Sequence, residues 1–472
     1  MTDMASPPGR ISSGTSAGIL PILFKLPGWM MAALLFALVL AMAPVAGSLA
    51  RPVFAAGCIA VGCYAWRQSP HSHLQTVFFL FCFAPFARRV VDYYAGFDSI
   101  GIMLIGPLAT ILIPTPRLIR LIDGRTNPFE KGLAPITVVL ICVAYAAFIS
   151  LFKGAWMDAS AGALKWFAPL IYAMVLIETG DRDRLIDAAA QIFQIILPIM
   201  GLYGVFQYVD PPSWDRYWME FATTVTAGLP LPYEVRVYST LNGPASFATI
   251  TAAGILIVSF LRPPLLAIPA VIPAALALLL SQYRTAWLSL ALGILFCTLF
   301  AKTRTRSGFI LAALALGGMI ALTIPEFNDA LLARFQSFSE GTQDGSAQER
   351  LQEFVILWSE PWSSLFGVGF TVGDPGVAGT MPVDGMIIAC WLMMGMMVGF
   401  FCLSGFAWAC LRMALNAFRS QRASAVVLGG LGCGSLLQMP LANISAAELG
   451  LLFWTFAAIA CLPEQKSAER DT

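Results

Sequence analysis

The strongest constraint on this chain is a repeated pattern of apolar blocks, each about fifteen to thirty residues long, that runs from about residue 29 to residue 462. A helix needs about 20 mostly apolar residues to cross a bilayer, so each block is a candidate span. Charged residues make up only 12% of the chain, against about 25% in a soluble domain. We therefore predict an all-α polytopic membrane protein. The same composition excludes a disordered or collagen-like chain, a disulfide scaffold and a nucleic-acid-binding protein.

The blocks predict fourteen transmembrane helices, with twelve as the main alternative. Their approximate ranges are 29–49, 52–66, 74–87, 99–114, 132–152, 162–177, 185–208, 244–261, 264–280, 285–301, 308–325, 384–411, 423–440 and 446–462. Several are shorter than a full span, so 52–66 and 74–87 are expected to be tilted, re-entrant or lengthened by flanking residues. The whole chain, residues 1–472, then forms a single membrane domain.

The distribution of basic residues predicts the orientation. With a cytoplasmic N-terminus, eighteen of the 28 lysines and arginines fall on the cytoplasmic side, including the dense clusters at 117–131, 302–306 and 412–422. Both termini are therefore expected in the cytoplasm. The net charge of +1 indicates no particular partner.

Two long loops fall on the opposite, extra-cytoplasmic side, at about 209–243 and 326–383. Both are rich in proline, glycine, tryptophan and carboxylates, and loops of this length are a natural place for chemistry. In the second loop Leu351, Phe354, Val355 and Trp358 recur at helical spacing. They predict an amphipathic helix that lies against the membrane or caps a cavity.

Cysteine and histidine exclude several kinds of site. All ten cysteines fall inside apolar blocks, where they behave as small hydrophobic residues, so no disulfide framework or zinc site is indicated. The two histidines, His71 and His73, share one short segment. A histidine-based metal centre or a Ser/His/Asp triad elsewhere is therefore excluded, and we expect neither a metal nor a cofactor.

Arginines on the extra-cytoplasmic side are unusual under positive-inside bias, so each needs a reason. The candidates are Arg88, Arg89, Arg236, Arg284, Arg334 and Arg350. Charge at membrane depth is costly, and a planar guanidinium with five donors suits a diphosphate, so several of them converging on one cavity would bind a lipid-linked diphosphate without a metal. The alternative is that each arginine reaches the lipid headgroups or pairs with a nearby acid, such as Asp92, Glu234 or Glu349.

Asp384 begins the twelfth predicted span, in the sequence MPVDGMII. A desolvated carboxylate at that position would serve as a general base. An aspartate before an apolar run is also a normal helix N-cap, and one residue can do both.

Four short motifs follow one another on the extra-cytoplasmic side: RVYSTLNGPASFA (236–248), SQYRTAW (281–287), GSAQER (345–350) and LFGVGF (365–370). Together with Asp384 and the glycine-containing helix after it, they resemble the O-antigen ligase and Wzy polymerase superfamily. The resemblance covers about residues 236–412, whereas the N-terminal half agrees only in hydropathy.

This resemblance implies a GT-C-like glycosyltransferase of the bacterial inner membrane, acting at the periplasmic face on undecaprenyl-diphosphate-linked glycans. Carried onto this sequence, Arg284 would contact the lipid diphosphate, and Arg350, or Arg334 in its place, would complete the clamp. Arg236 would line the same cavity, and Arg350 and Asp384 are the expected catalytic residues.

The resemblance also bears on the choice between polymerase and ligase. Ligases of this superfamily typically carry a histidine at the start of the helix after the large loop, where this chain has Asp384, so an exopolysaccharide-type polymerase is favoured. Two alternatives are an O-antigen ligase that transfers glycan to an acceptor such as lipid A-core, and a flippase or carrier of the same substrate. A scaffold in an assembly complex would leave the outer arginines unexplained. The expected partners are lipid-linked oligosaccharide, membrane lipids, and flippase, chain-length and export proteins.

Overall fold

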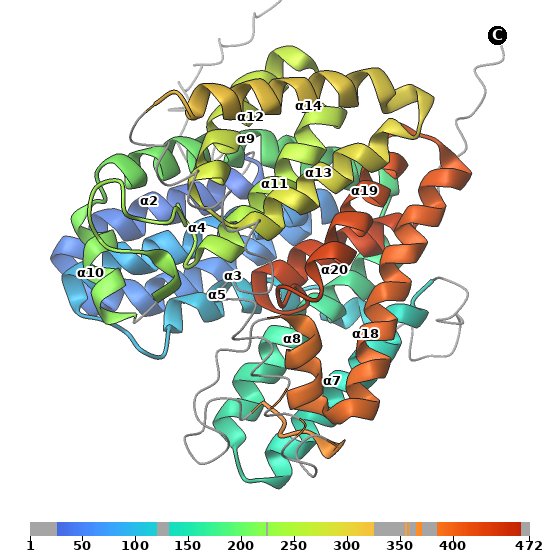
Figure 1. Ribbon diagram of the computed structural model, residues 1–472. Helices are drawn as coiled ribbons and strands as arrows, with labels where there is room; N and C mark the ends of the chain where they lie inside the picture. Colours follow the sequence, from blue (N-terminus) through green and yellow to red (C-terminus); the bar gives the residue numbers. More distant parts are fainter. Residues whose placement is uncertain are drawn as a thin grey trace, which may run out of the picture.

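The computed structural model describes residues 26–119, 132–222, 225–324, 355, 358, 365–370 and 385–463, and these fold into a bundle of helices (Figure 1). The bounds of the main helices are α2 (Gly28–Ala46), α3 (Ala50–Gln68), α4 (Pro70–Ala95), α5 (Ile102–Leu112), α7 (Ala134–Phe152), α8 (Trp156–Thr179), α9 (Arg182–Val209), α10 (Ser213–Phe221), α11 (Pro244–Leu261), α12 (Pro264–Leu280), α13 (Arg284–Thr298), α14 (Ala301–Ala321), α18 (Met386–Ser420), α19 (Ala423–Gln438) and α20 (Ala447–Cys461). Three 3-10 turns accompany them: η1 (Gly47–Leu49), η2 (Thr115–Leu118) and η3 (Val225–Ala227).

The prediction of an all-α polytopic membrane protein is confirmed. Among the described residues, seven helical stretches are long and apolar enough to cross a membrane, and the first of them, Gly28–Gln68, joins α2 and α3. Five further apolar helices are shorter, among them α12, α13, α19 and α20. Each predicted block coincides with a helix, although the helix bounds differ from the predicted ones by several residues at some ends.

Helix starts follow local sequence signals at one end of the bundle. The Ser69 hydroxyl accepts a hydrogen bond from the Ser72 N–H at 3.0 Å, with Pro70 at the first position of α4. Asp181 caps α9 in the same way, through the N–H groups of Asp183 and Arg184. These caps satisfy amide groups that would otherwise be unpaired at a helix N-terminus.

Small residues allow the helices to pack closely. A Cβ placed on Gly201 of α9 would lie 2.4 Å from the backbone nitrogen of Ala274 in α12. In the same way, a Cβ on Gly293 of α13 would lie 3.2 Å from the carbonyl oxygen of Gly430 in α19. Such contacts are the usual means of association between membrane helices, and they fix α12 and α13 against their neighbours.

One predicted span is not a single continuous helix. The block 384–411 was expected to be one continuous helix, but α18 breaks at Gly395, where φ is 75° and ψ is 166°. The sulfur atoms of Cys390 and Cys402 lie 3.7 Å apart, whereas twelve residues of a straight helix would span about 18 Å. Residues 386–394 therefore fold back against 396–420 as a helical hairpin, visible as two orange arms in Figure 1.

Hydropathy cannot detect this reversal because the residues on both sides of Gly395 are apolar. The backbone conformation at Gly395 is one that essentially only glycine adopts, so the break depends on a single residue in the run MMGMM.

The helices do not all begin at the same level. At the end of the bundle where α9 ends and α11 and α13 begin, called here the Arg284 end, α7 and α8 extend beyond their neighbours (Figure 1). Gly450 of α20 packs beside Pro169 of α8, and Gly180, just after α8, packs beside Leu462, just after α20, so these two helices run parallel. From this register α8 begins about ten residues, or about 15 Å, before α20. The Arg284 end is thus recessed at α20.

Candidate functional site

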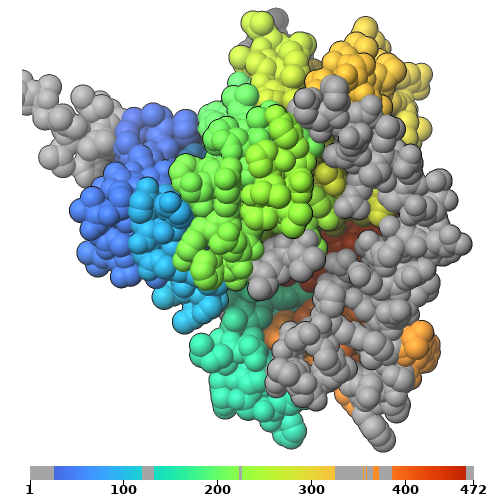
Figure 2. Space-filling view, turned by 60° about the vertical axis from the view of Figure 1, so that its left-hand side comes forward, coloured from blue at the N-terminus to red at the C-terminus, as the bar shows by residue number. Residues whose placement is uncertain are grey.

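The segment after α9 is fastened to the bundle by a buried polar network around Arg89. The Arg89 Nε lies 2.9 Å from Asp215 Oδ1, and both side chains have no exposed surface. The two terminal nitrogens of Arg89 donate to the carbonyl oxygens of Ser239 and Leu241. One guanidinium therefore ties α4 to α10 and to the largely buried RVYSTLNG segment. In Figure 2 the green part of the chain, which includes α10, lies beside the blue N-terminal helices.

Two side chains of α9 complete this network. Tyr203 and Gln207 donate to Asp215 Oδ2 at 2.8 and 2.6 Å, respectively. The Gln207 amide oxygen accepts from the backbone N–H groups of Tyr238 and Ser239 at 3.1 and 2.8 Å. Burial raises the pKa of Asp215, although Arg89 and the hydrogen bonds from Tyr203 and Gln207 act in the opposite direction. Ser239 has a φ of 50°, which is unusual for a serine and is held in place by these contacts.

Arg88 also has protein partners. Its Nε lies 3.3 Å from Asp92 Oδ2, and Arg51 reaches Asp92 Oδ1 at 2.8 Å. Arg88 donates in addition to the carbonyl oxygen of Asp98 and lies over the ring of Phe97. Pairing of this arginine with Asp92 was the alternative to diphosphate binding in the sequence analysis. Since Arg88 is 8% exposed and Arg89 is fully buried, neither side chain faces an open cavity in this structure.

Arg236 and Arg284 are separated by 48 positions in sequence, but their segments pack together. The Val237 N–H donates to the Leu280 carbonyl oxygen at 3.2 Å, and Arg236 Nη2 lies 3.5 Å from the Gln282 carbonyl oxygen. Gln282 has a φ of 55°, and this tight turn leads directly into Arg284 at the start of α13. The segments that carry the two arginines are thus joined by hydrogen bonds at the same end of the bundle.

Hydrogen bonds within the segment hold the SQYR turn in place. Ser281 Oγ and Trp287 Nε1 both donate to the carbonyl oxygen of Leu278, at 2.6 and 2.9 Å. Arg284 and Arg236 are each half-buried. A fixed turn with half-buried guanidiniums is suited to binding an anion at the rim of the bundle.

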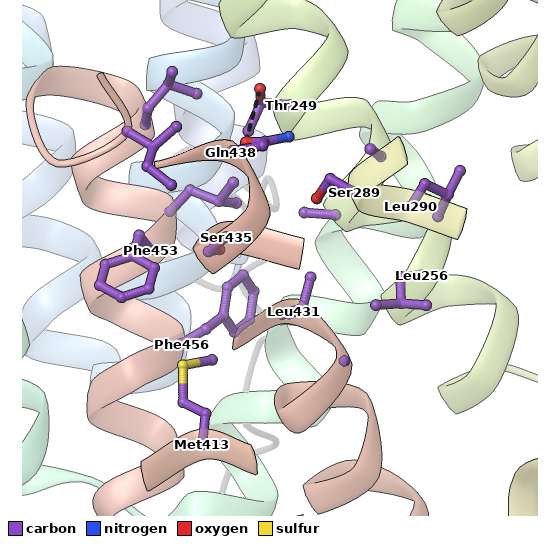
Figure 3. A pocket seen from close by; sticks show the side chains of 16 residues that line it. Thr249, Leu256, Ser289, Leu290, Met413, Leu431, Ser435, Gln438, Phe453 and Phe456 are labelled. Atoms are coloured by element: carbon purple, nitrogen blue, oxygen red, sulfur yellow. Dashed lines mark hydrogen bonds between the residues drawn. The ribbon is translucent and has the colours of Figure 1, made fainter. Parts of the chain in front are cut away.

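A second group of polar residues lies nearby, where α11, α19 and α20 meet. Ser246 Oγ donates to Glu448 Oε1 at 2.6 Å, and Thr249 Oγ1 lies 3.5 Å from Gln438 Oε1. Both Ser246 and Glu448 are half-buried. Below them a narrow pocket of about 30 Å³, room for one or two water molecules, has Thr249 and Gln438 at one end and Met413 and other apolar side chains at the other (Figure 3).

The hairpin of α18 begins at the same corner. The Met386 N–H donates to the Met439 carbonyl oxygen at 3.0 Å, and a Cβ on Gly385 would lie 2.6 Å from the Pro440 carbonyl oxygen. Gly385 has a φ of 100°, so the close approach and the backbone both require glycine. Asp384 itself lies outside the described residues, as do Arg334 and Arg350, and the roles of all three remain predictions.

The LFGVGF motif serves to hold the hairpin. The N–H groups of Val368 and Gly369 donate to the carbonyl oxygens of Leu392 and Met393 at 2.8 and 2.9 Å. Lys153 Nζ donates to the Val368 carbonyl oxygen at 3.2 Å. This motif therefore fixes the position of the Gly395 turn.

The predicted amphipathic helix falls largely outside the described residues. Val355 and Trp358, which are described, are helical and 67% and 69% exposed. The Trp358 ring lies 5.5 Å from that of Trp391, so this part of the large loop contacts the first arm of the hairpin.

Two important groups were missed by sequence reasoning. Asp215 lies in an apparently surface-exposed WDRYW segment, and its partner Arg89 is 126 positions away, so no local pattern connects them. Glu448 is a single charge in the apolar run 446–462, and nothing in the sequence shows what it contacts. Within the described ranges, no three histidine, cysteine or acidic side chains lie close enough together to hold a metal ion.

Comparison with known families agrees with the motif order. Residues 269–383 match the family model described as O-antigen ligase. The matched region contains α13 with Arg284, continues through LFGVGF and ends directly before Asp384. Among curated proteins no significant match to the chain is found.

The matched family comprises glycosyltransferase-like polymerases and ligases of polysaccharides, which act on lipid-linked oligosaccharides in bacterial membranes. The multi-pass helical fold and the position of the match agree with this assignment. Residues 269–383 are thus similar to the O-antigen ligase family, in agreement with the resemblance to the O-antigen ligase and Wzy polymerase superfamily that the sequence motifs carry.

Proposed function

We propose that this chain is an inner-membrane polysaccharide polymerase that joins undecaprenyl-diphosphate-linked oligosaccharide repeat units at the periplasmic face. Arg284 and Arg236 would bind the diphosphate at the Arg284 end, with Arg350 or Arg334 completing the clamp. The observation that carries the proposal is the packing of the Arg236 segment against the turn before α13, and this turn lies within the region matched by the family.

Helix N-termini at the Arg284 end support an anionic substrate. The helices α11, α13 and α20 all begin there, and none has a side-chain cap at its N-terminus. The positive ends of their dipoles favour negative charge at this end.

A polymerase is favoured over a ligase by the positions of the histidines. Both histidines of the sequence lie in the first turns of α4, at the opposite end of the bundle. His73 is fully buried, with its ring nitrogens 3.1 Å from the Tyr172 hydroxyl and 3.2 Å from the Thr110 carbonyl oxygen. No histidine is therefore available for the role that ligases of this superfamily typically give to one.

In the proposed reaction a sugar hydroxyl of one lipid-linked unit attacks the anomeric carbon of another. The bond between that carbon and the phosphate oxygen breaks, and its electron pair leaves on the diphosphate. Fixed guanidiniums stabilise the charge that develops there, and in a site of low dielectric this is usually a large part of catalysis. Arg88 and Arg89 have protein partners, so we assign them to support of the loops rather than to the diphosphate.

The test is synthesis by purified protein in detergent from a lipid-linked repeat unit of known structure. A polymerase makes a ladder of longer lipid-linked glycans. Arg284→Ala should lower the initial rate by about 100-fold or more, the usual cost of removing one such donor. Arg216→Ala is the matched control, because Arg216 is 43% exposed and pairs with Asp210, which is 66% exposed, at the surface.

Two results would refute the proposal. If Arg284→Ala kept the rate of Arg216→Ala while both proteins were equally folded, the arginine clamp would be wrong. If no ladder formed but glycan moved to a lipid A-core acceptor, the chain would be a ligase. Movement of intact substrate across vesicles without any longer product would instead indicate a carrier.

A further inference from the structure

Glu448 is an acid inside the bundle that the arginine clamp does not use. It lies in the first turn of α20, half-buried, and no lysine or arginine of the described residues pairs with it. A charge at membrane depth costs about 2.5–3.5 kcal/mol on insertion scales, so an unpaired carboxylate in this position needs an explanation. Its partner in the described part of the chain is Ser246, whose hydroxyl donates to Oε1 at 2.6 Å.

Backbone geometry next to Glu448 is also unusual. Ala447, the first residue of α20, has a φ of 50°, although alanine disfavours the left-handed region. Strain of this kind persists only where the surrounding structure enforces it, and it is common at functional sites. Two positions before Ala447, Ser445 Oγ is buried without a hydrogen-bond partner among the described residues.

The position of the pair connects it to the proposed diphosphate site. Ser246 lies in the first turn of α11, ten residues after Arg236 and within the same motif. The α19–α20 connection that precedes Glu448 holds Gly385 and Met386 through Pro440 and Met439. The helix α13, which begins at Arg284, packs on α19, since a Cβ on Gly434 would lie 2.4 Å from Ser289 Oγ.

We propose that Glu448 accepts the proton of the attacking sugar hydroxyl, and that Ser246 passes this proton on. This inference rests on the proposed polymerase function and names the proton acceptor for it. Because the Ser246 hydroxyl donates to Glu448, its own lone pairs remain available to accept a hydrogen bond from a sugar hydroxyl.

The proton balance of the step is closed. As the sugar oxygen bonds to the anomeric carbon, its proton moves to Ser246 Oγ while the original Ser246 proton moves to Glu448. The bond between the anomeric carbon and the phosphate breaks, and the electron pair leaves on the diphosphate. Protonated Glu448 returns its proton to water or to the departing diphosphate before the next cycle.

A purely structural role makes a different prediction. A carboxylate in the first turn of a helix stabilises its dipole, and the Ser246 bond would simply join α11 to α20. Glu448→Gln keeps the size of the side chain and an oxygen that accepts from Ser246, but it cannot take up a proton at neutral pH. This variant therefore separates proton transfer from packing.

The experiment compares Glu448→Gln, Glu448→Asp, Ser246→Ala and Asp384→Asn in the detergent assay, with thermal unfolding of each purified variant. Glu448→Gln should lower kcat by at least about 100-fold while KM and the unfolding temperature stay close to wild type. Glu448→Asp should restore part of the lost rate, and Ser246→Ala should lower kcat by a smaller factor.

Different results would contradict the role of Glu448 as the base and the proposed function. A wild-type kcat in Glu448→Gln would overturn the assignment, and a large loss in Asp384→Asn alone would make Asp384 the base. A fall in unfolding temperature with unchanged kcat would leave Glu448 with a structural role only. Failure of the wild-type protein to form polymer would instead refute the proposed function itself.

Discussion

Removal of one partner of the Arg89–Asp215 pair should be among the most damaging single changes in this protein. Both side chains have no exposed surface, and the ionic contact is 2.9 Å. Asp215→Ala would leave the Arg89 charge uncompensated in the interior, at a cost of about 3–5 kcal/mol. It would also leave the donors of Tyr203 and Gln207 without their acceptor.

A double-mutant cycle measures the coupling between the two residues. Arg89→Ala, Asp215→Ala and the double variant are purified in detergent, and their unfolding free energies are compared. We expect the double variant to be more stable than the sum of the single losses predicts, with a coupling of about 2–3 kcal/mol, because the second substitution removes a charge that the first had left unpaired. Asp215→Asn keeps the size of the side chain without its charge, so its cost isolates the ionic part.

The same cycle tests the link between this network and activity. Arg89 holds the carbonyl oxygens of Ser239 and Leu241, so its loss should free the segment that carries Arg236 and lower polymer synthesis in Arg89→Ala. Strictly additive unfolding energies, or an Asp215→Ala protein as stable as wild type, would refute the reasoning.

Three further predictions concern other parts of the fold. Gly395→Ala should abolish the helical hairpin and lower the yield of folded protein in gel filtration, because a Cβ there would lie 2.2 Å from the Leu365 carbonyl oxygen. The control is Gly317→Ala on α14, where a Cβ would meet nothing within 4 Å, and this variant should fold normally. In a variant whose only cysteines are Cys390 and Cys402, a membrane-permeant oxidant should join the two sulfurs, 3.7 Å apart, and mass spectrometry that found only free thiols would argue for a straight helix. Burial alone would raise the pKa of Asp98, but the carboxylate accepts hydrogen bonds from the Ile102 and Ile100 N–H groups, and the pKa is lowered on balance. The stability that ionised Asp98 provides is therefore present above about pH 4, and it is lost as the pH falls through the lower pKa of the folded state. Asp98→Ala should therefore destabilise the protein by roughly 1.5–3 kcal/mol at pH 7, and the gap in unfolding temperature should narrow in acid; a gap independent of pH would contradict this.

Hydropathy was sufficient to predict where the helices lie, because each apolar run coincides with a helix, although several of these helices are shorter than a full membrane span. It was not sufficient to predict the reversal at Gly395, where the residues before and after the turn are equally apolar. The apolar blocks therefore predict the positions of the helices but not the path of the chain through 384–411.

Contiguous motifs in the sequence were sufficient to single out two segments that the structure brings together, whereas the binding role of their arginines stays a prediction. Arg236 and Arg284 each belong to a short motif, and the structure packs the two motifs together. Arg88 and Arg89 were predicted at the diphosphate, but pattern alone could not show that Arg89 meets an aspartate 126 positions away. For Arg88, the acid one helical turn later was visible, and the structure confirms that pairing.

The recess at the Arg284 end has a consequence for the surrounding bilayer. The helices α13, α19 and α20 have 15, 16 and 15 residues, so they are about 22–24 Å long, against about 30 Å for the hydrocarbon core. Such a mismatch is relieved by local thinning of the lipid, at a cost that increases with membrane thickness. The acyl-chain length of the host membrane would then help to set how readily a lipid headgroup descends to the arginines, so that lipid composition becomes a determinant of the catalytic rate.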